Sequence, residues 1–210
     1  MNRIPSQKNL LIFLSVIFIS VFIWSVIHPR TFLTWFLEVM PALTGLVIIV
    51  LTYRRFHLTS FVYILITIHA VILMIGGHYT YAHMPLFDWI RDTFGLSRNY
   101  YDKVGHFAQG FVPAIIAREL LIRTSALKKG KWLFFNIVCI CLAISAFYEL
   151  LEWQYAVIKG GESAKEFLGS QGDIWDAQSD MAMALIGSVV ALVLLSKLHD
   201  KAIKPYLNGK

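Results

Sequence analysis

Six long apolar stretches constrain the fold of this chain more than any other feature of its sequence. A hydrocarbon core of about 30 Å needs about 20 apolar residues in a helix that rises about 1.5 Å per residue. We therefore expect an all-α polytopic membrane protein, a bundle of about six transmembrane helices in a single domain over residues 1–210. The expected helices cover roughly residues 9–27, 33–53, 59–77, 103–122, 132–157 and 174–196.

Composition agrees with this expectation. Hydrophobic residues make up 57% of the chain and charged residues only 15%, which is too apolar for an ordinary soluble domain. The formal net charge is +6, but the Lys and Arg residues form short clusters between the apolar stretches. That distribution is typical of membrane topology and not of nucleic-acid binding. We therefore expect membrane lipids, and no nucleic acid, as partners.

The loops predict an orientation in the bacterial inner (plasma) membrane. The two terminal segments and the loops near residues 54 and 129 hold 12 Lys and Arg, whereas the alternate loops hold 6. Because Lys- and Arg-rich loops stay in the cytoplasm, we expect both termini there. Residues 78–102 then form a long outer loop with an amphipathic pattern, which is either a short interfacial helix or a plain connection.

Acidic and histidine side chains gather near the outer end of the expected bundle. They are Asp102 and His106 in the fourth stretch, Glu149 and Glu152 in the fifth, and Asp176 and Asp180 in the sixth. Each pair is three or four residues apart and so shares one side of a helix. A carboxylate inside a bilayer costs roughly 2.5 to 3.5 kcal/mol, so such groups face a bundle interior or a water-filled cavity. In the inner half we expect Arg118 and Glu119 to reach the interface.

So many acids in a small volume need protons, basic groups or a divalent metal ion to balance their charge. Carboxylates with an imidazole suit Zn, Mn or Fe, and carboxylates alone suit Mg or Ca. The predicted metal ligands are Asp102, His106, Glu149, Asp176 and Asp180. Glu152 and His78 are the predicted catalytic residues, as general bases.

Other interpretations of single residues stay open at this point. Asp102 and Asp173 are alternatively helix N-caps. Glu152 and His78 are alternatively solvated at the interface, and His69 is expected to be a satisfied core histidine.

Three classes of function fit these observations. The first is a metal-dependent hydrolase or transferase that acts on a lipid-linked or envelope substrate. The second is non-catalytic binding of a lipid headgroup or an envelope precursor, and the third is a proton-coupled transporter. The transporter is disfavoured because the chain shows no internal repeat and its polar groups stop halfway across the membrane.

Three segments, YDKVGHF (101–107), FYELLEW (147–153) and GDIWDAQSDM (172–181), resemble the YjdF family of small bacterial inner-membrane proteins. A more distant resemblance is to the VanZ-like membrane proteins, which are associated with glycopeptide resistance. The residues that match the VanZ-like pattern are Asp102, Lys103, His106, Glu149 and Asp180. The arginine that this pattern places shortly before the last aspartate is not evident in the sequence. The resemblance implies a polytopic fold with a polar site and no particular reaction.

Overall fold

The structure, a computed structural model, describes residues 5–161 and 168–207. The described part contains seven helices and no strand, which confirms the all-α prediction. The helices are α1 (Pro5–Val26), α2 (Phe32–Thr52), α3 (Ser60–Tyr79), α4 (Pro85–Phe94), α5 (Tyr101–Thr124), α6 (Lys131–Lys159) and α8 (Asp176–Leu207).

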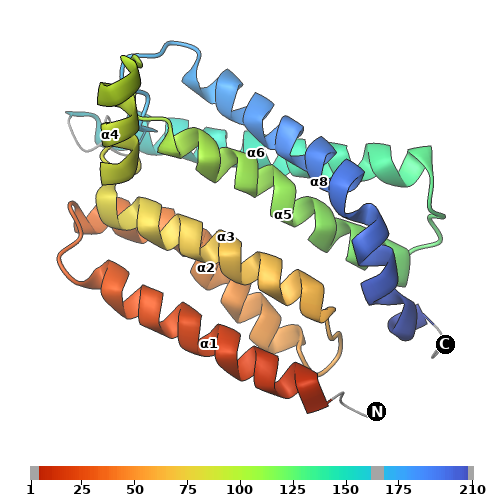
Figure 1. The fold of residues 1–210 in the computed structure, drawn as a ribbon. Helices are drawn as coiled ribbons and strands as arrows, with labels where there is room; N and C mark the ends of the chain where they lie inside the picture. Colours follow the sequence, from red (N-terminus) through yellow and green to blue (C-terminus); the bar gives the residue numbers. More distant parts are fainter. Residues whose placement is uncertain (1–4, 162–167, 208–210) are drawn as a thin grey trace.

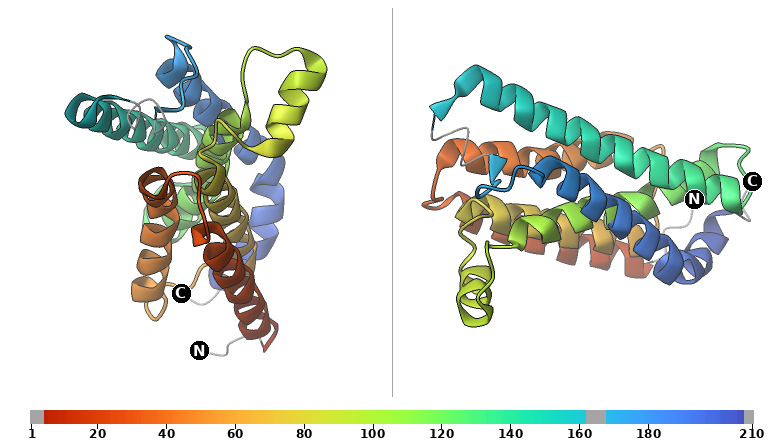
Figure 2. Two further views of the ribbon diagram at one scale, coloured as in Figure 1. Left: turned by 90° about the vertical axis from the view of Figure 1, so that its left-hand side faces the viewer. Right: turned by 90° about the horizontal axis from the view of Figure 1, so that it is seen from above.

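The long helices run side by side, and the short helix α4 lies across one end of the bundle (Figures 1 and 2). We call this the α4 end; both chain termini lie at the opposite, terminal end (Figure 1). Helices α1, α2 and α3 pack together as one half, and α5, α6 and α8 form the other half. Contacts between α3 and α5 join the two halves.

Five helices, α1, α2, α3, α6 and α8, are long and apolar enough to cross a membrane. Helix α5 has 24 residues but is less apolar than these five, because acidic and basic side chains occur near both of its ends. It packs against α3, α6 and α8, so these charged side chains face protein instead of lipid. The chain is therefore a polytopic membrane protein with its least apolar long helix inside.

Helices α4 and α8 show where the structure decides between, or goes beyond, the expectations from the sequence. Helix α4 occupies the amphipathic part of the long outer loop, begins with Pro85 and ends at Gly95, whose φ of 63° is left-handed. This segment is therefore a short helix and not a plain connection, whereas its interfacial location stays a prediction. Helix α8 continues to Leu207 instead of ending near residue 196, because His199 and Ile203 are fully buried against the bundle.

A network of buried charged groups lies around the last turns of α5, at the terminal end of the bundle. The Glu119 carboxylate, which is fully buried, accepts hydrogen bonds from the Thr59 backbone and hydroxyl (2.9 and 2.7 Å) and from Arg123 (2.7 Å). Arg118 can only donate, so His199 Nδ1 accepts its bond (2.8 Å) and His199 Nε2 donates to Glu119 (3.1 Å). The expectation that Arg118 and Glu119 reach the interface is therefore wrong for Glu119, which tertiary partners hold inside.

An apolar core separates this network from the α4 end. Its buried members come from α1, α3, α5, α6 and α8 and the segment before α3. They include Val62, Ile115, Ile137, Cys141 and Leu192. Charged groups therefore gather at the two ends of the bundle, with an apolar layer between them.

Helices α5 and α8 touch backbone to backbone where glycines face them. A Cβ added at Gly110 would overlap the carbonyl oxygen of Ala184, and one at Gly187 would overlap the carbonyl oxygen of Phe107. Both glycines are buried. This close approach sets the distance between α5 and α8. The same distance determines how near the side chains of the two helices come to each other at the α4 end.

We predict that Gly110→Ala destabilises the protein by about 1 to 3 kcal/mol, because the new methyl group forces α5 and α8 apart. Gly45→Ala is the matched control, since a Cβ at Gly45 meets no atom within 4 Å. It should leave stability unchanged or raise it by up to about 1 kcal/mol through helix propensity. Denaturant unfolding in detergent measures both, and equal effects of the two substitutions would contradict the prediction.

Candidate functional site

The site begins on the first turns of α5. Asp102 and His106 lie one turn apart, with His106 Nε2 3.4 Å from Asp102 Oδ1. Both residues are buried. The N-cap position of α5 is Tyr100 and shows no side-chain cap, so the N-cap interpretation of Asp102 is wrong. Asp102 points into the bundle instead.

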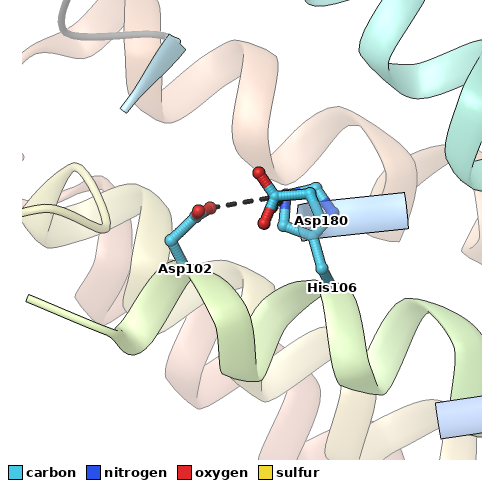
Figure 3. Close-up of side chains that lie close together, drawn as sticks. All are labelled: Asp102, His106 and Asp180. Atoms are coloured by element: carbon cyan, nitrogen blue, oxygen red, sulfur yellow. Dashed lines mark ion pairs between the residues drawn. The ribbon is translucent and has the colours of Figure 1, made fainter. Parts of the chain in front are cut away.

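Helix α8 adds Asp180 to this pair. Its Oδ1 atom lies 3.8 Å from His106 Nε2, and only 2% of the residue is exposed. One side-chain oxygen or nitrogen from each of Asp102, His106 and Asp180 falls within 4.8 Å of the other two (Figure 3). Two helices that approach closely at Gly110 and Gly187 thus bring these predicted ligands together.

The other predicted metal ligands border this triad. Glu149, on α6, places Oε1 3.7 Å from His106 Nδ1. Asp176, in the first turn of α8, instead faces basic groups, with Oδ1 2.7 Å from Lys103 Nζ and 2.5 Å from Arg98 Nη1. Asp173 precedes α8 and accepts a hydrogen bond from the backbone of Trp175 (2.9 Å), so it stabilises the turn before that helix.

Arg98 is a site residue that the sequence analysis missed. It lies in the loop between α4 and α5, yet only 5% of it is exposed. Besides Asp176, its guanidinium lies 3.5 Å from Asp102 and 3.5 Å from Asp173 and donates to the Gly169 carbonyl (3.1 Å). In the sequence it is one of two arginines in the outer loop over residues 78–102, and no helical spacing there marks it as buried.

Hydrogen bonds to two other segments hold the loop that carries Arg98 in place. The Asn99 side chain donates to Met84 O and Asp88 Oδ1 (both 3.0 Å), which links the loop to α4. The Asn99 backbone exchanges two hydrogen bonds of 2.9 Å with the Gln171 side chain. Burial lowers the pKa of Arg98, but the hydrogen bond and charge of Asp176 raise it, and the net shift is upward. Arg98 is therefore a fixed positive charge.

A cavity of about 50 Å³ extends from Asp102 and His106, two members of the triad, toward α2 and α3 in the other half of the bundle. Its polar lining consists of Glu38, His69, Tyr81, Asp102, His106, Gln109, Tyr148 and Glu152. The Tyr148 hydroxyl donates to Glu38 Oε2 (3.3 Å). The His69 Nε2 atom is buried, accepts and donates no hydrogen bond, and lies on this lining. The expectation of a satisfied core histidine is therefore wrong at this atom. A polar space of this size has room for a few water molecules.

The two predicted catalytic residues fall in different places. Glu152 is 7% exposed and lines the cavity beside the triad, so the interpretation of Glu152 as a solvated residue is wrong. His78 contacts α1 instead, with Nδ1 3.0 Å from the Ser25 carbonyl and its ring centroid 4.4 Å from that of Trp24. The structure therefore brings Glu152, and not His78, to the site.

Carboxyl groups outnumber the fixed positive charges at this end of the bundle. The buried acids are Glu38, Asp102, Glu149, Glu152, Asp176 and Asp180. The basic groups that contact them are Arg98 and Lys103, with His106 as a further titratable group. Asp102 Oδ2 and Glu149 Oε1 are buried and accept no hydrogen bond. Because an unsatisfied buried acceptor costs about 1 to 3 kcal/mol, the cluster as it stands is suited to receive protons or a cation.

The residues that match known proteins include every residue of this site. A family model described as a predicted membrane protein (DUF2238) matches residues 10–201. The chain is 44% identical to "Inner membrane protein YjdF" of Escherichia coli (strain K12) over 186 residues, which cover 89% of this chain and 88% of the relative. No solved structure matches. The resemblance to the YjdF family is thus confirmed, whereas the VanZ-like resemblance stays a prediction.

We predict that Arg98→Gln lowers the free energy of unfolding by about 3 to 5 kcal/mol, because it leaves buried carboxylates without their fixed counter-charge. Arg91→Gln is the control: Arg91 pairs with Asp88 and Asp92 on α4, where no residue is buried, and its loss should have a much smaller effect on stability because exposed ion pairs contribute little. Thermal or denaturant unfolding in detergent distinguishes the two. A small effect of Arg98→Gln would show that the cluster does not depend on this guanidinium.

Proposed function

The chain belongs to the DUF2238 family of predicted membrane proteins, and within that family we propose that it binds a divalent metal ion at the extracytoplasmic end of its helix bundle. We place it in the inner membrane as a multi-pass protein, which its apolar helices and its inner-membrane relative support. We further propose that the metal site serves hydrolysis or group transfer on a lipid-linked envelope substrate.

One observation carries the metal proposal: the buried triad of Asp102, His106 and Asp180, whose ligand atoms lie within 4.8 Å of one another. Two carboxylates and an imidazole form a donor set that suits Zn, Mn or Fe. Asp102 Oδ2 and Glu149 Oε1, which are buried and accept no hydrogen bond, also fit this group, since a bound cation would interact with them directly. Asp176 and Glu149 border the triad and are the candidates for further ligands.

A divalent cation held here would supply Lewis-acid chemistry, which polarises carbonyl or phosphoryl oxygens and makes water more acidic. The residues of the chain would do the rest. Glu152 lines the cavity beside the triad and can accept a proton from water there. Glu38, held by the Tyr148 hydroxyl, lines the same space. His78 is not assigned a role, because its contacts are with α1.

The apolar core favours this function over transport. Between the triad and the network at Glu119 lie buried apolar side chains from several helices, including Ile115 and Ile137. A proton or ion path would need polar groups through that layer. Non-catalytic binding of a lipid headgroup at the same acids is the alternative, and it predicts that Asp→Asn substitutions preserve the protein while no metal is bound.

The orientation is a prediction of the loop charges. The terminal end carries most of the Lys and Arg, so we place it and both termini in the cytoplasm. Reporter fusions at the C-terminus and at the loop between α4 and α5 test this. An enzyme reporter that works only in the cytoplasm should be active at the C-terminus and inactive in that loop. The reverse pattern would move the site to the cytoplasmic face and overturn the envelope substrate.

Metal content tests the site directly. Elemental analysis of chelator-free protein in detergent should find a stoichiometric divalent metal in the wild type, and His106→Ala and Asp180→Asn should lose most of it, because each removes a ligand of the triad. Asp92→Asn and His28→Ala change exposed residues of the same types and should retain the metal. Added Mn²⁺ or Zn²⁺ should raise the unfolding temperature of the wild type and not of the triad variants. A wild type that neither contains nor binds these metals would overturn the proposal.

A further inference from the structure

Lys103 lies at the centre of the acidic cluster, on the turn of α5 between Asp102 and His106. Its Nζ atom is 2.6 Å from Asp180 Oδ1, 2.7 Å from Asp176 Oδ1 and 3.6 Å from Asp102 Oδ2. Only 11% of its side chain is exposed. The ammonium group therefore sits among three carboxylates, which is where a cation is favoured most.

The same oxygen of Asp180 faces both Lys103 and the imidazole. Asp180 Oδ1 is the atom 2.6 Å from Lys103 Nζ and 3.8 Å from His106 Nε2. A metal ion that binds Asp180 between Asp102 and His106 would share this carboxylate with the ammonium group. Two cations at that spacing repel strongly in a poorly hydrated site. A metal ion at this position and Lys103 would therefore compete for Asp180.

From these contacts we propose that Lys103 is a built-in competitor that sets the metal affinity of the site: it neutralises Asp180 and Asp176 in the metal-free protein and is displaced from Asp180 when a divalent ion binds. This inference rests on the proposed metal site. It adds the residue that controls loading and release of the ion, a role distinct from that of the ligands.

Lys103 is suited to displacement, and Arg98 is not. An ammonium group is a compact charge on a flexible stem, and both described hydrogen bonds of Lys103 go to carboxylates. Arg98 also donates to the Gly169 backbone, and its loop is held by Asn99. When a divalent ion takes Asp180, Lys103 can keep its bond to Asp176. Asp176 and Asp180 therefore each keep a cationic partner in both states, without a change in the fold.

The test compares metal affinity across substitutions of Lys103 in the full chain, purified in detergent and stripped of metal. Lys103→Met keeps the length of the side chain and removes the charge, and Lys103→Arg keeps the charge. Lys159→Met removes an exposed lysine from the same end of the bundle. Titration with Mn²⁺ and with Zn²⁺ should give about tenfold or tighter binding for Lys103→Met than for the wild type. Lys103→Arg and Lys159→Met should not tighten binding.

A thermal-stability measurement shows whether Lys103→Met is folded when its metal affinity is measured. Without metal, Lys103→Met should unfold at a lower temperature than the wild type, and saturating metal should raise its unfolding temperature by more than it raises that of the wild type. A Lys103→Met protein that stays unfolded even with saturating metal would overturn the inference, since the ion would then fail to replace the ammonium group.

The remaining outcomes separate this inference from the proposed function. Metal binding to the wild type with equal or weaker binding to Lys103→Met would overturn the competitor role and leave the metal site standing. If only Lys103→Met binds metal, the competition is upheld but the proposed function is overturned. The ammonium group of Lys103 would then exclude metal from the wild-type site. Binding to neither protein would overturn both.

Discussion

A charged side chain in the hydrocarbon core is costly, and α5 carries such side chains at both of its ends. Helix α5 is therefore placed between α3, α6 and α8, where every charged group can meet a protein partner. The close approach at Gly110 and Gly187 follows from the same need, because it brings the acids of α8 within reach of α5.

The two ends of α5 use buried charge for different purposes. At the terminal end, Glu119 has partners for both oxygens, and His199 is fixed in one tautomer between Arg118 and Glu119. Such a satisfied network holds helices in place. At the α4 end, acids outnumber the fixed bases, and Asp102 and Glu149 each leave an oxygen without a hydrogen bond. That imbalance is what distinguishes a site that can bind a ligand from a structural lock.

Residues without a periodic signal were the ones the sequence could not assign. Arg98 lies in a loop, where helical spacing no longer says which way a side chain points, and its burial depends on the Asn99 and Gln171 bonds that fold the loop inward. His78 is at the expected depth near the end of α3 but turns toward α1. His69 has no partner in the sequence, because the groups that share its cavity come from α2, α5 and α6.

The sequence by itself determined the class of fold and the depth of the polar groups, because helix length, apolar runs and three- or four-residue spacings are local properties. It therefore predicted the positions of the long helices, apart from the C-terminal part of α8, and grouped Asp102, His106, Glu149, Glu152, Asp176 and Asp180 at one end. Only the tertiary structure decided which of them meet. Whether Asp180 faces His106 depends on the rotation and spacing of α8 against α5. Those are set by the contact at Gly110 and Gly187 between these two helices, which are far apart in the sequence.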